Sequence, residues 1–277
     1  MTDMMDLIKS FILGIVEGIT EWLPVSSTGH LILVKELINS PSSFTATEFF
    51  PLYLYVIQLG AILAVVTMFF GKLNPFSPKK TQEEKKDTWQ MWFKVIIACI
   101  PAGVIGLVLN DMMDKIETWQ VVSAMLIVYG IAFIIVERIG KKTAVATMNQ
   151  MTYKTAFIIG LFQVLSIVPG TSRSGATILG GMLAGCSREL AAEFSFFLAI
   201  PIMFGVSLIK IVSYGSAVTA SEWGILAVGM IVSYLVSIAA IRFLMNYVRN
   251  HSFTSFGWYR IVLGIVVIGY FSIRSFI

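Results

Sequence analysis

Two polar stretches interrupt long apolar runs and decide the fold. They are Glu17-Gly18-Ile19-Thr20-Glu21-Trp22-Leu23-Pro24-Val25-Ser26-Ser27-Thr28-Gly29-His30 and Pro169-Gly170-Thr171-Ser172-Arg173-Ser174-Gly175. Charged and hydroxyl side chains are costly inside a bilayer and are usually kept there for a function. Non-helical backbone at membrane depth persists only where protein or a water-filled cavity shields it. The two stretches are therefore the predicted working site of the protein.

The composition predicts an integral membrane protein. The 277-residue chain is 57% hydrophobic and only 13% charged, whereas soluble proteins carry about 25% charged residues. Long apolar runs, rather than alternating ones, favour helices over a β-barrel. The net charge of +4 is assigned to cytoplasmic loops, so nucleic acid is excluded as a partner. Cys99 and Cys186 have no CxxC spacing and are expected to be buried thiols.

Six apolar runs are long enough to cross a bilayer, which requires about 20 residues. Two further apolar regions, 7–38 and 153–186, are each divided by one of the polar stretches, so that neither half can cross. Each of these regions is either a broken span or a re-entrant hairpin. The predicted fold class is an all-α polytopic membrane protein that forms a single domain. The six predicted spans are 47–70, 92–110, 118–137, 189–213, 222–245 and 256–274.

The charge of the loops distinguishes the two alternatives. Loops 71–91 and 138–154 are rich in Lys and Arg, whereas loop 110–118 is acidic. The positive-inside rule places the first two loops in the cytoplasm and the third outside. The same rule keeps the basic segment 246–255 inside only if region 153–186 re-enters the membrane instead of crossing it. The prediction is six spans, two re-entrant hairpins and both termini outside.

Short matches relate the two halves of the chain. Phe11-Ile12-Leu13-Gly14 recurs as Phe157-Ile158-Ile159-Gly160, and Ser26-Ser27-Thr28-Gly29 recurs at the same offset as Ser172-Arg173-Ser174-Gly175. Each half then holds one hairpin and three spans, and an odd number of spans inverts the second half. This predicts an inverted-topology repeat of residues 1–140 and 141–277, with its site at the repeat interface near the midplane.

The first polar stretch predicts two half-helices. Glu17 and Glu21 are four residues apart and share a face of the first half-helix. Pro24 ends that half-helix, and the hydroxyl residues after it can cap the second one. Ser27 and His30 can face the same way and are a candidate nucleophile and base. Either carboxylate could orient His30 or hold a water. Since the two carboxylates repel each other, a proton, the arginine of the second stretch or a divalent cation must relieve them.

The second stretch repeats this design. Pro169-Gly170 interrupts the helix, Thr171 or Ser172 caps the next one, and Arg173 lies at the new N-terminus. Helix N-termini bind anions through free backbone N–H groups and the helix dipole. Two such N-termini with hydroxyls and an arginine predict a site for a highly charged anion, with phosphate geometry preferred. The predicted phosphate-binding residues are Ser26, Thr28, Gly29, Thr171, Ser172 and Ser174.

Both stretches closely resemble the signature motifs of the undecaprenyl-diphosphate phosphatase family, whose members are also described as bacitracin resistance proteins. The resemblance covers essentially the whole chain, including Gln58-Leu59-Gly60-Ala61 and Ile100-Pro101-Ala102. It implies removal of the terminal phosphate from a C55 isoprenoid pyrophosphate carrier, which is recycled for cell-wall synthesis. It also implies a location in the bacterial inner (plasma) membrane with a site that opens outward.

The resemblance implies a catalytic set and a set of partners. The catalytic set is Glu17, Glu21, Ser27, His30 and Arg173. A divalent cation, Mg²⁺ or Ca²⁺, is implied as cofactor, with Glu17 and Glu21 as its candidate ligands. The implied partners are the isoprenoid pyrophosphate lipid and membrane lipid, and a homodimer is an alternative to a monomer.

An inverted-repeat transporter or flippase for a phosphorylated lipid is the alternative function. Inverted repeats with broken helices are transporter architecture. A carrier would need the anion site but not a nucleophile beside a histidine. A channel is not supported, because the sequence contains no pattern that would form a ring-shaped filter. Release of phosphate by the purified protein distinguishes hydrolysis from transport.

Overall fold

A computed structural model describes residues 4–38, 40, 43–140, 143–214 and 218–274. In these ranges the chain is built from α-helices and two short 3₁₀ helices, η1 (Phe44–Ala46) and η2 (Leu165–Ile167), without a β-strand. Only an isolated bridge joins Val145 to Cys186. The predicted all-α class is therefore confirmed.

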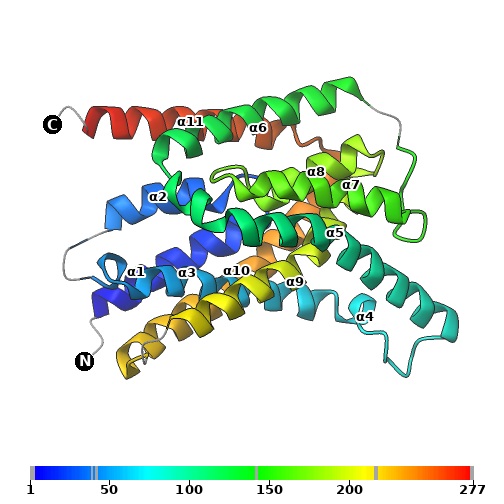
Figure 1. The fold of residues 1–277 in the computed structure, drawn as a ribbon, viewed down its shortest axis with the longest axis horizontal. Coiled ribbons are helices and arrows are strands. Elements are labelled where there is room, and N and C mark those ends of the chain that lie inside the picture. The colour runs from blue at the N-terminus through cyan, green and yellow to red at the C-terminus, as the bar shows by residue number, and fades with distance from the viewer. Residues whose placement is uncertain (1–3, 39, 41–42, 141–142, 215–217, 275–277) are drawn as a thin grey trace.

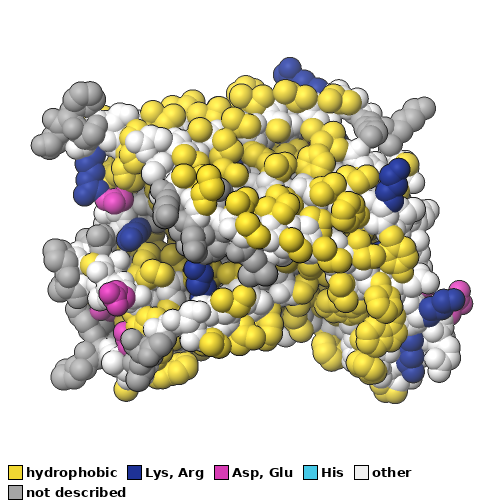
Figure 2. All heavy atoms as spheres, in the orientation of Figure 1, with side chains coloured by type: hydrophobic (Ala, Val, Ile, Leu, Met, Phe, Trp, Pro, Cys, Tyr) yellow, Lys and Arg dark blue, Asp and Glu magenta, His cyan; other side chains and the backbone are white. Residues whose placement is uncertain are grey.

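Six helices in the described ranges are long and apolar enough to cross a membrane, as the sequence predicts. Figure 2 shows hydrophobic side chains over most of the face in view, with charged side chains mainly toward its two ends. Soluble proteins rarely expose such a large contiguous apolar surface, which indicates that this one faces lipid. The six helices are α3 (Phe49–Met68), α5 (Gln82–Lys115), α6 (Trp119–Ile139), α9 (Arg188–Ser213), α10 (Ala220–Asn250) and α11 (Thr254–Arg274).

The two interrupted regions each form a pair of shorter helices. The first pair is α1 (Met4–Thr20) and α2 (Ser27–Ile38), and the second is α7 (Tyr153–Val164) and α8 (Arg173–Leu183). Within each pair the two helices contact each other, and α2 turns back toward the end of the molecule where α1 begins (Figure 1). This arrangement fits the re-entrant hairpins, which remain a prediction.

Two loops predicted from hydropathy are wrong in extent. Residues 71–91 include most of α4 (Phe70–Leu73) and the beginning of α5, and α5 also continues through most of 110–118 to Lys115. At the start of α5 the reason is that Lys, Glu and Gln are good helix formers, so the helix begins before its apolar segment. Thr81 and Glu84 also cap the start of α5 reciprocally, with N–H to side-chain oxygen distances of 2.7 and 3.2 Å. Residues 141–142, within the predicted loop 138–154, lie outside the described residues.

The helices of the two halves pack against each other in equivalent pairs, so that a contact made by one half is repeated with the halves interchanged. Helix α1 packs against α10, and α7, its expected counterpart, packs against α5; α3 packs against α9, and α6 against α11. An inverted two-fold repeat would produce this exchange. The start of α1 and the end of α11 also lie at the same end of the molecule (Figure 1), as an even number of crossings requires. The repeat boundaries 1–140 and 141–277 stay a prediction.

Glycines permit the closest of these helix contacts. A Cβ added to Gly160 of α7 would lie 2.4 Å from the carbonyl oxygen of Ala98 in α5, and one added to Gly14 of α1 would lie 2.8 Å from that of Gly229 in α10. Small residues are favoured between membrane helices because they let the backbones approach. The interrupted helices are thus held against full-length spans by backbone-to-backbone packing.

This packing predicts that Gly160→Val lowers the thermal unfolding temperature of the purified protein. Overpacking of a close contact costs about 1–3 kcal/mol. Gly205→Val is the matched control, because Gly205 is also inside a helix but a Cβ there meets nothing within 4 Å. Equal unfolding temperatures for the two variants would contradict the close packing of α7 on α5.

Candidate active site

The two polar stretches form turns with the same unusual backbone conformation. Ser26 and Ser172 both have φ of 73° and are the only non-glycine residues with positive φ in the described ranges. Each caps the helix that follows: Ser26 Oγ accepts from the Gly29 N–H at 3.3 Å and Ser172 Oγ from the Gly175 N–H at 3.2 Å. Such conformations are costly for non-glycine residues and cluster at functional sites. The matched geometry marks both turns as functional candidates.

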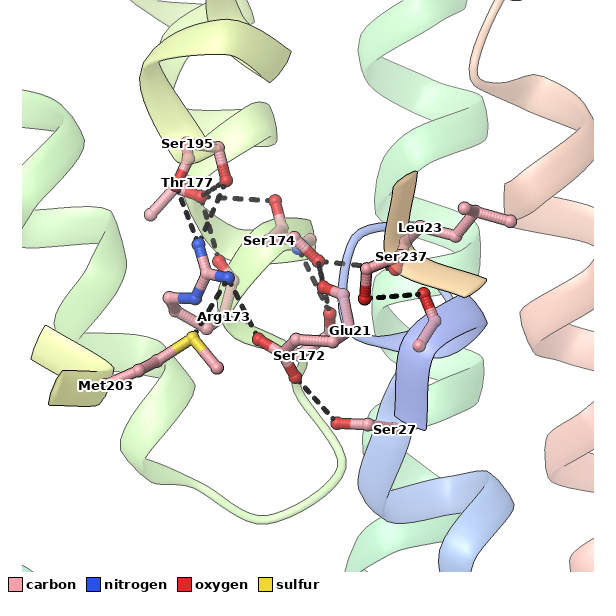
Figure 3. Close-up of polar contacts among 12 residues, drawn as sticks. Glu21, Leu23, Ser27, Ser172, Arg173, Ser174, Thr177, Ser195, Met203 and Ser237 are labelled. Carbon is pink, nitrogen blue, oxygen red and sulfur yellow. Dashed lines mark hydrogen bonds and ion pairs between the residues drawn. The ribbon is translucent and has the colours of Figure 1, made fainter. Parts of the chain in front are cut away.

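A buried ion pair joins the two turns. Arg173 Nη2 donates to Glu21 Oε1 at 2.9 Å, and the two side chains are only 11% and 9% exposed. Ser27 Oγ donates to the other carboxylate oxygen, Oε2, at 3.1 Å. Ser174 Oγ lies 3.1 Å from the Glu21 carbonyl oxygen, and Figure 3 shows these side chains converging. The structure thus brings Arg173 together with Glu21 and Ser27, which belong to the other, distant polar stretch.

Arg173 is held from several sides but keeps one free donor. Its Nη1 donates to the Ser195 carbonyl oxygen at 2.7 Å (Figure 3), and its guanidinium lies 5.6 Å from the centre of the Trp22 ring. Ser195 Oγ is in turn hydrogen-bonded to Thr177 Oγ1 at 2.7 Å. The Arg173 Nε is buried without a hydrogen-bond partner. A fixed guanidinium with an unused N–H is suited to bind a phosphate oxygen.

Glu17 lies one helical turn before Glu21 and is 1% exposed, with its Oε1 unpartnered. A buried carboxylate oxygen without a donor is costly, so it indicates a place for a ligand. In the described part of the chain no cluster of three or more His, Cys, Asp or Glu could hold a metal alone. Mg²⁺ is usually held by one or two carboxylates together with substrate phosphates. Glu17 and Glu21 therefore fit a cation that the substrate also ligates.

His30 is hydrogen-bonded to two partners other than Ser27. Its Nδ1 lies 2.7 Å from the Ser26 carbonyl oxygen, which can only accept, so Nδ1 carries a hydrogen. In the neutral imidazole, Nε2 then accepts from the Tyr259 hydroxyl at 2.7 Å. Among the hydrogen bonds of the described residues, none joins Ser27 to His30. Ser27 and His30 therefore do not form a direct hydrogen bond, because Tyr259 on α11 binds the imidazole while Glu21 binds Ser27; their roles as nucleophile and base stay a prediction.

The predicted phosphate-binding residues lie in these two turns and in the first helical turns that follow them. Ser172 Oγ and Ser174 Oγ lie 3.1 Å apart, Thr171 and Gly29 are buried, and Thr28 is half-buried in the first turn of α2. Their contacts with phosphate stay a prediction.

Arg260 is a functional candidate that sequence reasoning missed. It is fully buried on α11, and it donates to the carbonyl oxygens of Pro24, Gly170 and Thr171 at 3.2, 3.1 and 2.9 Å. It also donates to the Met125 carbonyl oxygen at 3.3 Å. One guanidinium therefore binds backbone from both turns. The available signal was that Arg260 lies within the apolar run 256–274, since such residues are rarely kept in a span without a use.

The fold and the site define a polytopic helical membrane protein with an internal polar site built from two interrupted helices. Residues 10–266 match the family described as Bacitracin resistance protein BacA, and the chain belongs to this family. Proteins named undecaprenyl-diphosphatase are similar over nearly the whole length. The one from Lactiplantibacillus plantarum is 53% identical over 276 residues, covering 98% of this chain and 99% of that protein.

Two further proteins named undecaprenyl-diphosphatase have a similar sequence identity to this chain. The protein from Enterococcus faecalis is 56% identical over 271 residues, covering 96% of this chain and 97% of its own. The protein from Desulfitobacterium hafniense is 51% identical over 278 residues and covers 99% of both chains. The family expected from the two motifs is therefore confirmed.

The contacts of Arg260 predict that Arg260→Met loosens both turns at once. Each buried carbonyl left without a donor costs about 1–3 kcal/mol. Amide hydrogen exchange should increase in residues 21–26 and in residues 170–172, and the unfolding temperature should fall. Arg242→Met is the control, because Arg242 is exposed on α10. Faster exchange confined to α11 would show that Arg260 does not hold the turns.

Proposed function

We propose that the chain hydrolyses undecaprenyl diphosphate to undecaprenyl phosphate and inorganic phosphate, and that the reaction takes place at the Glu21–Arg173 ion pair. Family membership and the names of the relatives support the reaction. The observation that carries the site assignment is the buried Arg173, which has an unused N–H and shares Glu21 with the Ser27 hydroxyl. This combination provides an anion site, a nucleophile and a proton acceptor.

The terminal phosphate binds at the starts of α2 and α8. The N–H groups of each first turn and the positive helix ends attract anions, and the hydroxyls beside them add donors. The phosphate competes with Glu21 for the guanidinium of Arg173, because both are anions that bind it. Substrate binding thus weakens the ion pair and leaves Glu21 a better proton acceptor beside Ser27.

The Ser27 hydroxyl then either attacks the terminal phosphorus or positions a water that attacks it. In the first route a bond forms from Ser27 Oγ to phosphorus, the proton passes to Glu21, and the bond from phosphorus to the bridging oxygen breaks. Undecaprenyl phosphate leaves with the electron pair, and water hydrolyses the phosphoserine. In the second route the oxygen of a water molecule attacks the phosphorus, a water proton passes to Glu21, and the same bond to the bridging oxygen breaks. His30, one turn along α2, is the proposed second acid/base. Positioning and charge neutralisation dominate phosphoryl transfer.

A divalent cation, Mg²⁺ or Ca²⁺, forms part of the proposal. Glu17 and Glu21 would hold it together with phosphate oxygens, and it would neutralise charge on those oxygens. The unpartnered Oε1 of Glu17 supports this role.

The proposed orientation places both termini and the site opening on the outer side of the bacterial inner (plasma) membrane. It rests on the basic character of 71–91, 138–154 and 246–255 and on the common end of α1 and α11 (Figure 1). A homodimer stays part of this proposal as the alternative to a monomer.

Transport of a phosphorylated lipid is less favoured than hydrolysis. A carrier uses the anion site, and the interrupted helices suit one. It has no use for a hydroxyl hydrogen-bonded to a buried carboxylate, which is the arrangement of Ser27 and Glu21.

The site assignment predicts that Arg173→Ala lowers phosphate release from undecaprenyl diphosphate by about 10³-fold, since it removes a charge that stabilises the transition state. Arg173→Lys keeps the positive charge but loses the planar set of N–H donors. Its rate of phosphate release should lie between those of the wild type and Arg173→Ala. Glu48→Ala is the control, because Glu48 is exposed before α3, and it should retain most activity. The readout is released phosphate from purified protein, and equal losses in Arg173→Ala and Glu48→Ala would overturn the assignment.

A further inference from the structure

An apolar groove of about 450 Å³ lies beside the turn that carries Glu21. It exists because α1 ends at Thr20, whereas α10, on which it packs, continues to Asn250. The space beyond the end of α1 is bordered by the second half of α10 and the first half of α11. Its walls include Ile19, Leu23, Phe243, Tyr247, Phe256 and Tyr259.

The polar side chains in this groove are already paired with protein groups. His30 and Tyr259 bind each other, and Tyr247 donates to Ser255 at 2.8 Å. Thr20 Oγ1 donates to the Val16 carbonyl oxygen at 2.7 Å. The groove therefore offers apolar surface without unmet polar groups. A hydrocarbon chain fits it, whereas a sugar or a phosphate would lose its hydration without compensation.

The groove adjoins the proposed diphosphate site across one turn of the chain. Leu23 and Val25 line the groove, while the carbonyl oxygen of Leu23 lies 3.3 Å from the hydroxyl of Ser174 on the other side of the turn. Glu21, two residues earlier, binds Arg173. A lipid whose diphosphate is at Arg173 can therefore place the adjoining part of its tail in the groove.

We propose that this groove binds the first isoprene units of the substrate, next to the diphosphate, and that it makes the enzyme selective for chain length. The inference rests on the proposed function. Sites for small molecules occupy about 300–1,000 Å³, so a groove of 450 Å³ holds only a few units. The remainder of the C55 chain stays in lipid. Selectivity then saturates once a chain is long enough to fill the groove.

The test compares diphosphates of one isoprene unit, of three units (farnesyl) and of eleven units (undecaprenyl). Ile19→Trp fills the groove, and the matched control is Ile8→Trp, since both residues lie on α1 with exposures of 41% and 47% but only Ile19 lines the groove. In Ile19→Trp, KM for the two longer substrates should rise by about tenfold or more. KM for the one-unit substrate, which fills the least of the groove, should rise by less, and Ile8→Trp should match the wild type for all three.

Two outcomes overturn the proposal. One is a dependence of KM on chain length that is the same in Ile19→Trp as in the wild type, and the other is an equal rise in KM for all three substrates. An independent measurement uses wild-type protein and an undecaprenyl diphosphate analogue with a photoreactive group on its first isoprene unit. Crosslinks should map to residues 15–25, 243–247 or 255–259, and crosslinks elsewhere overturn the proposal. Failure of the site assignment is distinguishable, because Arg173→Ala would then still hydrolyse all three substrates.

Discussion

The buried ion pair between Glu21 and Arg173 is the interaction on which the rest of the structure depends. Each charge comes from a different interrupted helix, and neither could stay in a low-dielectric interior alone, because an unpaired buried charge costs several kcal/mol. The pair therefore requires the turn after α1 to meet the start of α8. Once they meet, Ser27, Ser174 and the first turns of α2 and α8 are brought to one place.

The same requirement explains the polar residues around the pair. Interrupting a helix at membrane depth frees backbone groups that water cannot satisfy. Ser26 and Ser172 cap the N–H groups of the helices that follow, and Arg260 satisfies carbonyl oxygens of both turns. What remains unpaired is a small set, including Arg173 Nε and Glu17 Oε1. Arg173 Nε and Glu17 Oε1 are available for substrate, whereas other unpaired atoms belong to residues such as Gln163 on α7 and Ser233 on α10.

The sequence predicted the six spans and both interrupted regions, because the lengths of apolar runs and the positions of Pro and Gly are local properties. It did not predict how far α5 extends, since hydropathy reports the membrane boundary and not the end of a helix. The spacing of Ser27 and His30 suggested a pair, but Tyr259 on α11 binds the histidine instead. Arg260 was missed for a related reason: its partners are carbonyl groups far away in the chain, which no local pattern reveals.

A double-mutant cycle tests the ion pair most directly. The free energy of unfolding would be measured for Glu21→Gln, Arg173→Gln and the double variant, together with the wild type. Each single change should cost about 3–5 kcal/mol, because it leaves the other charge buried and unpaired. The loss in unfolding free energy of the double variant should be clearly smaller than the sum of the losses of the two single variants. Losses that simply add would show that Glu21 and Arg173 act independently, and would contradict the account.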